Sequence, residues 1–560
     1  MSSYKIGKVI GVIGDAIDIV LEDSIQENSG VPANMQINIS SENGPVPILI
    51  GQPGTFLKIQ LASGMLLCMV SGIKMKEGNS SNCETGVGVE LPQRILSLVP
   101  FGTINEQGKF EKGTDILPTI NSEVFAVSNT TINSIYSNYS AGNFNLGKLS
   151  LMPQQRALIN LDAFLSRHAA ILGQTGSGKS WTVASFLQKI ADLEKSTVVL
   201  LDLHGEYKNA FGDYADYIDA SSLELPYWLM NCEELLDLMV DRSESAAPNQ
   251  TALFRRLLQE SKQNHPENQA LNIPKINVDT PVYFDFEAIL NQFRDLDCEM
   301  VPGARSGTKK GDFNGQFTRL LTRIDSKLND VRYNLIFKPQ KYNTSASMSD
   351  LFKKILGEEE QPKKIVILDI SPIPFDVRTS VISLLLRCFF DFCYWYKKLN
   401  NQSYPLAIFC DEAHLYLNEY DPASKAARLS AERIAKEGRK YGASLTIISQ
   451  RPREVSATIL SQCNTFLCLR ITNPDDQSYV KRLLPDSIAS ITTMFSSLRR
   501  GECILLGDSV IMPTRIKIDI PNPTPDSEDT SFFNEWSKPH EEVNIPEVLD
   551  AWRKQGINNN

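Results

Sequence analysis

The sequence has no hydrophobic run long enough to cross a membrane. A transmembrane helix needs about 18 or more apolar residues in a row. The longest candidate here, residues 383–395, is interrupted by Arg387 and Asp391. Near the N-terminus, Asp15 and Asp18 break up the apolar residues, which a secretory signal peptide does not tolerate. We therefore predict a cytoplasmic protein that makes no use of a membrane.

Clustered cysteines and an excess of basic charge are also missing. The ten cysteines form no CxxC pair and no Cys/His cluster, which argues against a zinc site and a disulfide framework. The 56 basic and 66 acidic residues give a net charge of −10 with neutral histidines. This excludes a generally basic surface for nucleic acid, although it leaves room for a local basic lining.

The length of 560 residues is too great for one compact domain. Short apolar stretches separated by Gly, Pro, Asn and Ser predict an all-β domain at the start of the chain. Further on, apolar strand candidates alternate with helix-length segments, which indicates a parallel sheet covered on both faces. Helical patterns then interrupt this alternation. We predict a β domain (1–150), an α/β core in two parts (151–224 and 365–520), a helical insertion (225–364) and an acidic tail (521–560).

The strongest motif is Gly173-Gln-Thr-Gly-Ser-Gly-Lys-Ser180, a complete GxxxxGK[ST] phosphate loop between an apolar run and a helical segment. Its glycines let backbone N–H groups curl around phosphates, and the following helix N-terminus adds partial positive charge. Lys179 would hold the β- and γ-phosphates, and the Ser180 hydroxyl would ligate Mg²⁺. We therefore predict an ATP–Mg²⁺ site. Its nucleotide-binding residues would be Gly173, Thr175, Gly176, Ser177, Gly178, Lys179, Ser180 and Trp181.

Two acids, Asp411 and Glu412, follow the strand candidate 406–410. Asp411 would orient Mg²⁺ and its waters, and Glu412 would polarise the attacking water, an arrangement that suits hydrolysis. Residues 411–414 also spell the Asp-Glu-Ala-His box of DEAH helicases. The gap of 232 residues from Lys179 (411 minus 179) and the absence of the QxxGRxGR motif argue against that group.

Other polar residues follow further strand candidates. Asp202, His204 and Glu206 come after residues 197–201 and would contact the γ-phosphate or the attacking water. The alternative for Asp202 is that it caps its own loop through backbone amides. Gln450 also ends a strand candidate and would sense the γ-phosphate, because a neutral amide can bond both phosphate oxygen and water. The alternative is an ordinary polar residue at a strand end.

Two basic stretches stand out in this acidic chain. The first stretch is residues 425–453. Within it, Arg439 is the first choice for an arginine that completes the nucleotide site of the next subunit in a ring. The alternative is that Arg439 forms a surface salt bridge. Residues 305–341 suggest a track for a phosphate backbone, although a helix charged on its solvent side explains them equally well. The candidates for DNA contact are Lys309, Lys310, Arg319 and Arg323.

With these motifs in order, the chain resembles the HerA-type ATPases of the FtsK–HerA group over nearly its whole length. Each motif alone is modest, but nine in this order are highly specific. They lie at residues 167–180, 202–207, 369–377, 411–414, 437–442, 449–452, 461–465, 470–477 and 501–502.

The resemblance implies a RecA-like motor domain with a parallel sheet, an N-terminal HAS-type β-barrel and a helical insertion. It also implies a homo-hexameric ring that encircles duplex DNA and translocates along it with ATP. By analogy Glu412 is the catalytic acid, Gln450 the sensor and Arg439 a finger in trans. Arg167, just ahead of the phosphate-loop strand, is a second candidate for phosphate contact.

Relatives of this type act with a partner docked on the barrel face. Many bacterial ones pair with a nuclease or a sirtuin-like NAD-consuming effector in antiphage defence. This chain has no nuclease or NAD-hydrolase signature of its own, so any effector activity would come from another polypeptide. Two alternatives to a DNA translocase stay open: an ATP-binding hexameric scaffold that gates a toxic effector, and an unrelated P-loop ATPase acting on protein or metabolite.

Overall fold

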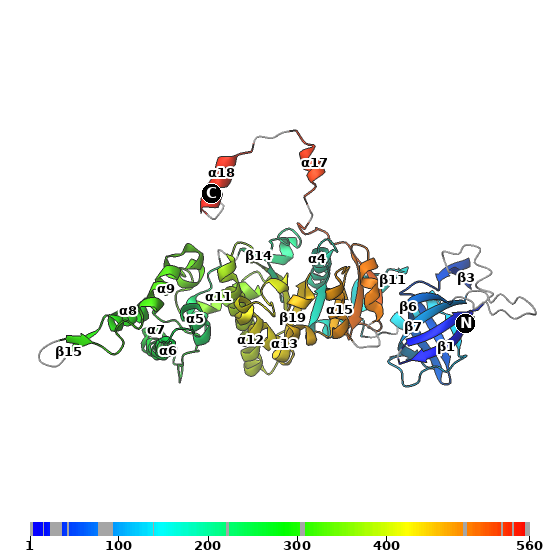
Figure 1. Ribbon diagram of the computed structural model, residues 1–560, viewed down its shortest axis with the longest axis horizontal. Coiled ribbons are helices and arrows are strands. Elements are labelled where there is room, and N and C mark those ends of the chain that lie inside the picture. Colours follow the sequence, from blue (N-terminus) through cyan, green and yellow to red (C-terminus); the bar gives the residue numbers. More distant parts are fainter. Residues whose placement is uncertain are drawn as a thin grey trace, which may run out of the picture. The chain divides into compact units, whose positions relative to one another are not determined.

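A computed structural model describes the chain in two compact units, residues 1–525 and residues 526–560. The described residues are 4–14, 16–22, 36–41, 44–76, 93–137, 139, 141–219, 223–302, 308–484, 490–527, 530–539 and 543–554. The first unit contains a β-barrel, a large α/β core and a helical insertion (Figure 1).

The N-terminal part forms a closed antiparallel barrel, as predicted. Alternating apolar residues such as Ile6, Leu57 and Leu66 fill its interior and are fully buried. Pairing of residues 17–20 with residues 95–98 closes the barrel. In spatial order its strands are β2 (Ala16–Leu21), β1 (Lys5–Ile13), β9 (Glu123–Ala126), β5 (Phe56–Leu61), β6 (Gly64–Lys76) and β7 (Gln93–Ile104). The short strand β8 (Phe110–Lys112) extends β7, and β3 (Gln36–Ser41) pairs with β4 (Gly44–Leu49).

The barrel ends earlier than the predicted boundary at residue 150. After β9 comes α2 (Asn129–Ser137), and then β10 (Phe144–Leu149) and β11 (Met152–Ile159) form a hairpin. This hairpin joins the central sheet of the core, because β10 pairs with β22 (Thr514–Ile518). An alternating pattern identifies a strand but not its sheet, which explains the late boundary.

An 11-stranded sheet forms the centre of the core. Its parallel part reads β20-β12-β19-β18-β13-β17-β14, and β21, β22, β10 and β11 continue it as antiparallel neighbours. Every residue of β12, β13, β17 and β18 is buried, in agreement with a sheet covered by helices on both faces. The bounds are β12 (Ala169–Leu172), β13 (Val198–Asp202), β14 (Ala215–Asp219), β17 (Ile365–Asp369), β18 (Leu406–Cys410), β19 (Ala443–Ser449), β20 (Thr465–Cys468) and β21 (Glu502–Gly507).

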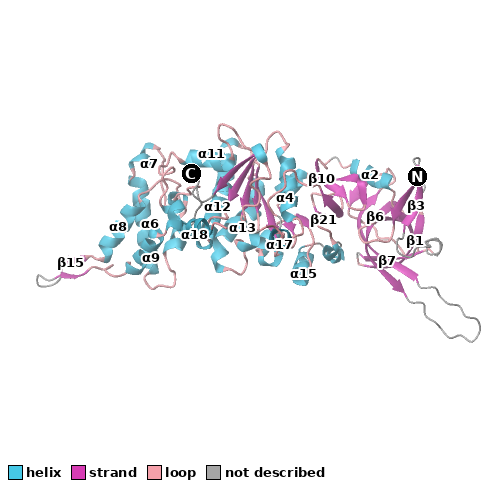
Figure 2. Cartoon of the chain, turned by 90° about the horizontal axis from the view of Figure 1, so that it is seen from above, coloured by secondary structure: helices cyan, strands magenta, loops and turns pink. Residues whose placement is uncertain are grey.

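Helices cover this sheet and make up most of the insertion, which Figure 2 shows as an almost entirely helical region. The core helices are α3 (Leu161–Ser166), α4 (Lys179–Ala191), α12 (Phe375–Asn400), α13 (Lys425–Glu437), α14 (Ala457–Ser461) and α15 (Pro474–Leu483). The insertion holds α5 (Cys232–Met239), α6 (Ala247–Asn264), α7 (Pro266–Ala270), α8 (Phe286–Asp297), α9 (Thr318–Asn329), α10 (Asn334–Phe337) and α11 (Met348–Leu356). A hairpin of β15 (Met300–Pro302) and β16 (Thr308–Lys310) projects from it.

The second unit carries two short helices, α17 (Phe532–Trp536) and α18 (Ile545–Lys554). Large apolar side chains are exposed on both helices, including Phe533, Trp536 and Trp552. Within the described residues of the whole chain, no helix combines the length and apolar character that a membrane crossing requires. The structure confirms the predicted α/β core with an N-terminal barrel and a helical insertion.

Candidate nucleotide site

The predicted nucleotide-site motifs come together at one edge of the central sheet. The phosphate loop follows β12, Gln450 follows β19, and Asp411 and Glu412 follow β18. These parallel strands end in register, with Leu172 opposite Ser449. The acids do not follow the strand next to β12, because β19 lies between β12 and β18. This order puts Gln450 between the phosphate loop and the acids.

Glycines give the phosphate loop its tight curl. Gly176 and Gly178 have φ values of +73° and +100°, in the left-handed region that other residues rarely adopt. A Cβ on Gly173 would lie 2.7 Å from Ser177 Oγ and 2.8 Å from Leu469 Cβ. Only glycine therefore lets this loop pass so close to its own serine and to the end of β20. Gly178 is also the residue that directly precedes α4.

Lys179 and Glu412 face each other across the site. Lys179 Nζ lies 3.8 Å from Glu412 Oε1, and both side chains are nearly buried, at 9% and 12% exposure. Glu412 adopts a left-handed backbone conformation with φ +43°, which is uncommon for glutamate and directs its side chain from the strand end. Burial raises the pKa of Glu412, while the nearby positive charges of Lys179 and His204 oppose this.

Acidic side chains surround the hydroxyl that would ligate Mg²⁺. Ser180 Oγ donates a 2.7 Å hydrogen bond to Glu206 Oε2. Burial and the negative charges of Glu412, Asp202 and Glu206 raise the pKa of Asp411 well above its usual value. A cation would relieve this repulsion, so the residues fit Mg²⁺. Among the described residues no three His, Cys, Asp or Glu side chains form a group that could hold a metal ion by themselves.

Asp202 is a loop cap rather than a phosphate contact. Its Oδ1 accepts hydrogen bonds from the backbone N–H groups of His204, Gly205 and Glu206, and its Oδ2 accepts one from Tyr207. Both carboxylate oxygens of Asp202 are thus engaged with the backbone of its own loop. These hydrogen bonds fix the conformation of the loop. The loop in turn places Glu206 next to Ser180 and the exposed His204 near Glu412.

Gln450 and His414 lie beside the reacting edge. Gln450 Oε1 accepts a 2.5 Å hydrogen bond from Thr175 Oγ1 of the phosphate loop. His414 Nδ1 lies 3.3 Å from Glu412 Oε2 and 3.4 Å from Ser449 Oγ. Burial lowers the pKa of His414 to about 4, so its ring is neutral at physiological pH. The sequence offered this histidine only as the last letter of a helicase box, so its contact with Glu412 was not predicted.

Trp181, in the first turn of α4, is half-buried. The guanidinium carbon of Arg500 lies 5.1 Å from the centre of its ring. Nothing in the sequence connects these two residues, because they are far apart along the chain.

Arg167 and Arg439 lie at the N-terminal ends of the parallel strands, whereas the phosphate loop lies at their C-terminal ends. Arg167 comes just before β12, and its Nη1 forms a 2.6 Å ion pair with Asp508. Arg439 lies in a 3-10 turn before β19 and is exposed. Within the described residues no hydrogen bond or ion pair of Arg439 is found. The whole length of β12 separates Arg167 from the phosphate loop of its own chain, so the predicted phosphate contact of Arg167 would have to be made at the site of another chain.

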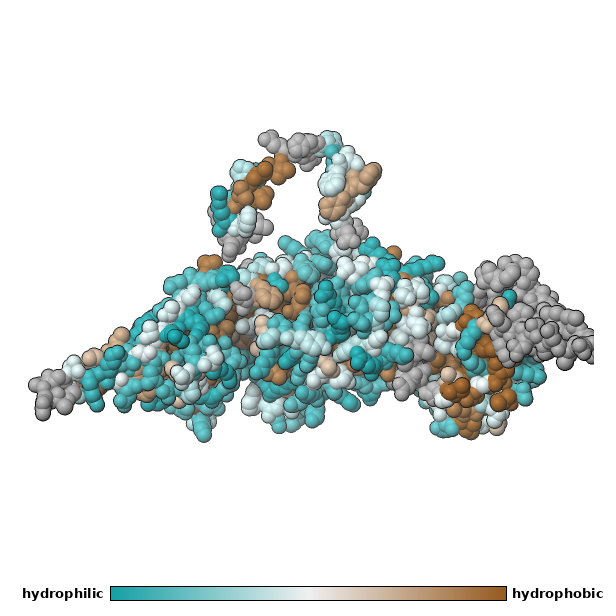
Figure 3. Space-filling view, viewed as in Figure 1, coloured by the Kyte–Doolittle hydropathy of each residue, from teal (hydrophilic) through white to brown (hydrophobic). Residues whose placement is uncertain are grey.

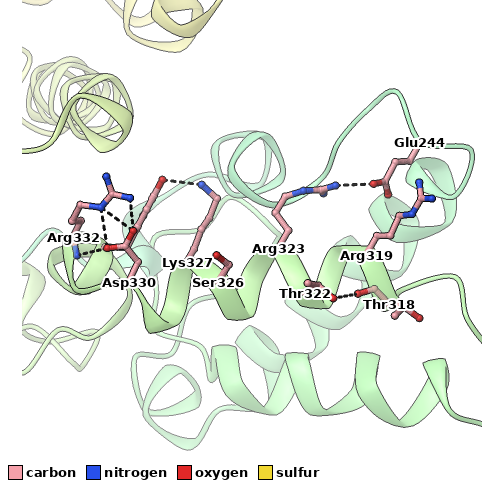
Figure 4. Close-up of a pocket in the computed structure, with 10 residues that line it drawn as sticks. Glu244, Thr318, Arg319, Thr322, Arg323, Ser326, Lys327, Asp330 and Arg332 are labelled. Carbon is pink, nitrogen blue, oxygen red and sulfur yellow. Dashed lines mark hydrogen bonds and ion pairs between the residues drawn. The ribbon is translucent and has the colours of Figure 1, made fainter.

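The four candidates for DNA contact have different surroundings. Lys309 and Lys310 are exposed on β16, and Arg319 is exposed on α9. Arg323 instead donates a 2.7 Å hydrogen bond to Glu244 Oε1 (Figure 4). It also donates to Met239 O, at 2.7 Å. Its guanidinium holds α9 against α5 and the loop that follows, so a DNA contact by Arg323 would have to replace these hydrogen bonds.

Comparisons with known proteins agree with this architecture. The model for the central domain of helicase HerA matches residues 144–389. The DNA double-strand break repair helicase HerA of Saccharolobus solfataricus is 27% identical over 433 residues, 77% of this chain and 79% of that protein. A probable helicase of Methanocaldococcus jannaschii is 25% identical over 417 residues, 74% of each chain.

Among solved structures, VirB4 of Thermoanaerobacter pseudethanolicus is 17% identical and superposes with a TM-score of 0.47, covering 68% of this chain and 97% of VirB4. The domain match starts at β10 and includes the phosphate loop, while the similarity to the relatives extends over about three quarters of the chain. With its complete phosphate loop and paired acids, the chain is similar to helicase HerA, and the central part of the chain matches the central domain of that helicase.

Proposed function

We propose that this chain is an ATPase that drives a homo-hexameric ring along duplex DNA. The observation that carries the proposal is the pairing of Lys179 with Glu412 at 3.8 Å over a complete phosphate loop. Relatives named as DNA double-strand break repair helicases support DNA as the substrate. The net charge of −10 requires that DNA be held by local cations rather than by the whole surface.

Hydrolysis would use residues that already face one another. Lys179 would neutralise charge on the β- and γ-phosphates, and Glu412 would orient the attacking water and accept its proton. The raised pKa of the Glu412 carboxyl makes it a stronger base than an exposed glutamate. Mg²⁺, when bound beside Ser180 and Asp411, supplies positive charge to the phosphates. Gln450, hydrogen-bonded to Thr175, is placed to sense the terminal phosphate.

Ring assembly would complete this site from a second chain. Arg439 is exposed at the edge opposite the phosphate loop, so it cannot reach its own nucleotide. In a ring, that edge would face the phosphate loop of the next subunit, where an arginine stabilises charge in the transition state. Arg167 lies at the same edge and would join Arg439 if its ion pair with Asp508 opened.

The exposed cations of the insertion would contact the DNA backbone. Lys309, Lys310 and Arg319 are exposed, and among the described residues they have no hydrogen-bonded or ion-paired acid. Cations of this kind bind phosphates and release counterions, so binding would weaken steeply as salt rises.

A separate effector, a nuclease or a sirtuin-like NAD-consuming enzyme, would dock on the barrel and act with the motor in antiphage defence. Exposed apolar residues on the barrel support a docking surface there. Ile13 is 82% exposed at the end of β1, and Ile120 is 65% exposed in the loop that bonds to β1 at Val9. Figure 3 shows apolar atoms gathered on this part of the molecule. Contiguous apolar surface of this kind marks a protein-binding site.

Steady-state ATP hydrolysis at low salt, with and without linear duplex DNA, tests the motor. Lys179→Ala serves as the blank because it lacks the phosphate-binding cation. We expect DNA to stimulate hydrolysis strongly. An equal rate of hydrolysis with and without DNA would contradict the translocase. It would favour the alternative, an ATP-binding hexameric scaffold that gates its effector. The acidic surface of the chain is the observation that favours this second candidate.

A further inference from the structure

The order of the strands tells which end of the nucleotide lies on which side of the phosphate loop. Gln450, Glu412 and Glu206 follow β19, β18 and β13, all on one side of β12. The residue that activates water has to face the terminal phosphate, so the γ-phosphate lies on this side. The nucleoside, at the other end of the triphosphate, must then leave toward β20 and β21.

The segment before β21 lies on that other side and touches the phosphate loop. Because β21 runs antiparallel to β20, its first residue is at the same sheet edge as the loop. The Gly501 N–H donates a 3.0 Å hydrogen bond to Ser177 O. A Cβ on Gly178 would lie 3.1 Å from Gly501 N and 3.8 Å from Arg500 Cγ. Arg500 is therefore fixed beside the loop through its own backbone.

The side chain of Arg500 is exposed and rests on the ring of Trp181, with 5.1 Å between the guanidinium carbon and the ring centre. A planar guanidinium on an aromatic face is attracted to the ring and loses little freedom when a second flat group stacks on it. Among the described residues no carboxylate pairs with Arg500, so its charge is available.

We propose that Arg500, backed by Trp181, is the binding surface for the base of the nucleotide, and that it selects a purine. The guanidinium stacks on the base, and a purine offers more surface to it than a pyrimidine does. This proposal rests on the proposed ATP site but concerns the nucleoside rather than the phosphates. Trp181 acts through Arg500 and is a positioning residue.

Calorimetric titration of the full chain with two Mg²⁺-bound ligands separates base from phosphate contacts. One ligand is a non-hydrolysable ATP analogue, and the other is inorganic tripolyphosphate, which has no base. Loss of one stacking contact in Arg500→Ala should weaken the ATP analogue about 10-fold and leave tripolyphosphate unchanged. Arg500→Lys should behave like Arg500→Ala, because an ammonium keeps the charge but cannot stack as a plane.

Arg499→Ala is the matched control, since it removes the same charge from the neighbouring exposed residue. Both ligands should bind it as they bind the wild type. Equal weakening of both ligands by Arg500→Ala, or no weakening of the analogue, would overturn the proposal. Binding of neither ligand to the wild type would instead overturn the proposed ATP site. A uridine analogue should bind the wild type more weakly than the ATP analogue, and this difference should shrink in Arg500→Ala.

Fluorescence provides a readout that does not depend on affinity. The chain has five tryptophans, and Trp181 lies in the first turn of the helix that follows the phosphate loop. Nucleotide binding should change the emission of the wild type, and Trp181→Phe should remove that change while the analogue still binds. A change that persists in Trp181→Phe would contradict the placement of the base.

Discussion

At the scale of single side chains, Glu412 is constrained by two residues and by its own backbone. Lys179 faces one of its carboxylate oxygens, His414 faces the other, and its backbone is held in the left-handed region. Glutamate rarely adopts this conformation, so the surrounding structure has to maintain it. These contacts fix the orientation of the carboxylate that, in our proposal, activates the attacking water.

Removing the charge of this carboxylate should stop hydrolysis without stopping binding. Glu412→Gln keeps the shape of the side chain but cannot accept a proton, so we expect turnover at least ~100-fold slower with ATP still bound. Single-turnover hydrolysis and nucleotide titration measure the two effects. The exposed acid Glu359 gives the control Glu359→Gln, which should turn over normally. Turnover by Glu412→Gln near that of the wild type would remove Glu412 from its role.

His414 should act by holding Glu412 in place. His414→Leu removes the polar contact at Glu412 Oε2, and we expect kcat to fall about 10-fold or more with KM little changed, because a misplaced group costs rate rather than binding. His414→Asn keeps an N–H donor close to the position of Nδ1 and should recover much of the rate. If the leucine and asparagine variants lose kcat equally, the histidine only fills space.

Two buried histidines should make stability depend on pH. Burial lowers the pKa of His168 and of His414 to about 4, against 6.5 for a free histidine. Above pH 6.5 both are neutral in the folded and unfolded chains. Between pH 6.5 and 4 only the unfolded chain takes up these protons, so stability falls as the pH falls, by up to about 1.4 kcal/mol per pH unit for each histidine.

Denaturant midpoints between pH 7 and pH 5 measure this loss. His168 Nδ1 accepts a 3.0 Å hydrogen bond from the Leu445 backbone N–H, an interaction that His168→Gln can retain without titrating. This variant should therefore flatten the pH dependence relative to the wild type. An equal slope in the two proteins would contradict the assignment.

At the scale of elements, the strands of the core were the most predictable feature. The apolar run predicted at residues 406–410 is β18 in the structure, and the run predicted at residues 197–201 lies one residue before the bounds of β13. Strand order was beyond the sequence, because β19 reaches its place between β12 and β18 only through tertiary pairing. The same limit hid the sheet to which β10 and β11 belong.

The site residues divide in the same way. The phosphate loop and its acids were recognisable, since each motif is contiguous and has one chemistry. Asp202 caps its own loop, which was the alternative considered from the sequence. The partners of Arg323 and Arg500 were not recognisable, because the sequence does not show which distant side chain, backbone or ring an arginine contacts. Helix α9 shows the consequence, since two of its arginines one turn apart have different roles.

On α9, Arg319→Ala and Arg323→Ala should therefore separate DNA binding from stability. Arg319→Ala should lower DNA affinity and reduce the slope of log K against log salt by about one phosphate contact. Arg323→Ala should leave that slope unchanged and instead destabilise the insertion, because it leaves Glu244 without its 2.7 Å partner. Fluorescence anisotropy over a salt series and thermal unfolding measure the two. A change of slope in Arg323→Ala alone would reverse the assignment.

At the scale of the whole molecule, the phosphate loop and Arg439 lie at opposite ends of the parallel strands. The proposed arginine finger would therefore serve the nucleotide site of a second chain. Mixing inactive Arg439→Ala chains with inactive Glu412→Gln chains should restore some hydrolysis, because some interfaces then combine an intact Glu412 with an intact Arg439. Mixed rings without recovered activity, with mixing verified by mass, would argue against a finger in trans.

The pairing of β12 has a consequence for synthesis of the protein. Its neighbours β19 and β20 are encoded far downstream, and Ala169 pairs with Thr446, a separation of 277 residues (446 minus 169). Contacts this distant form late and slowly. A ribosome must therefore release most of the chain before the phosphate loop has its sheet around it. Until then the nascent polypeptide exposes apolar strands that have no partner, and its phosphate loop lacks the strands that position it.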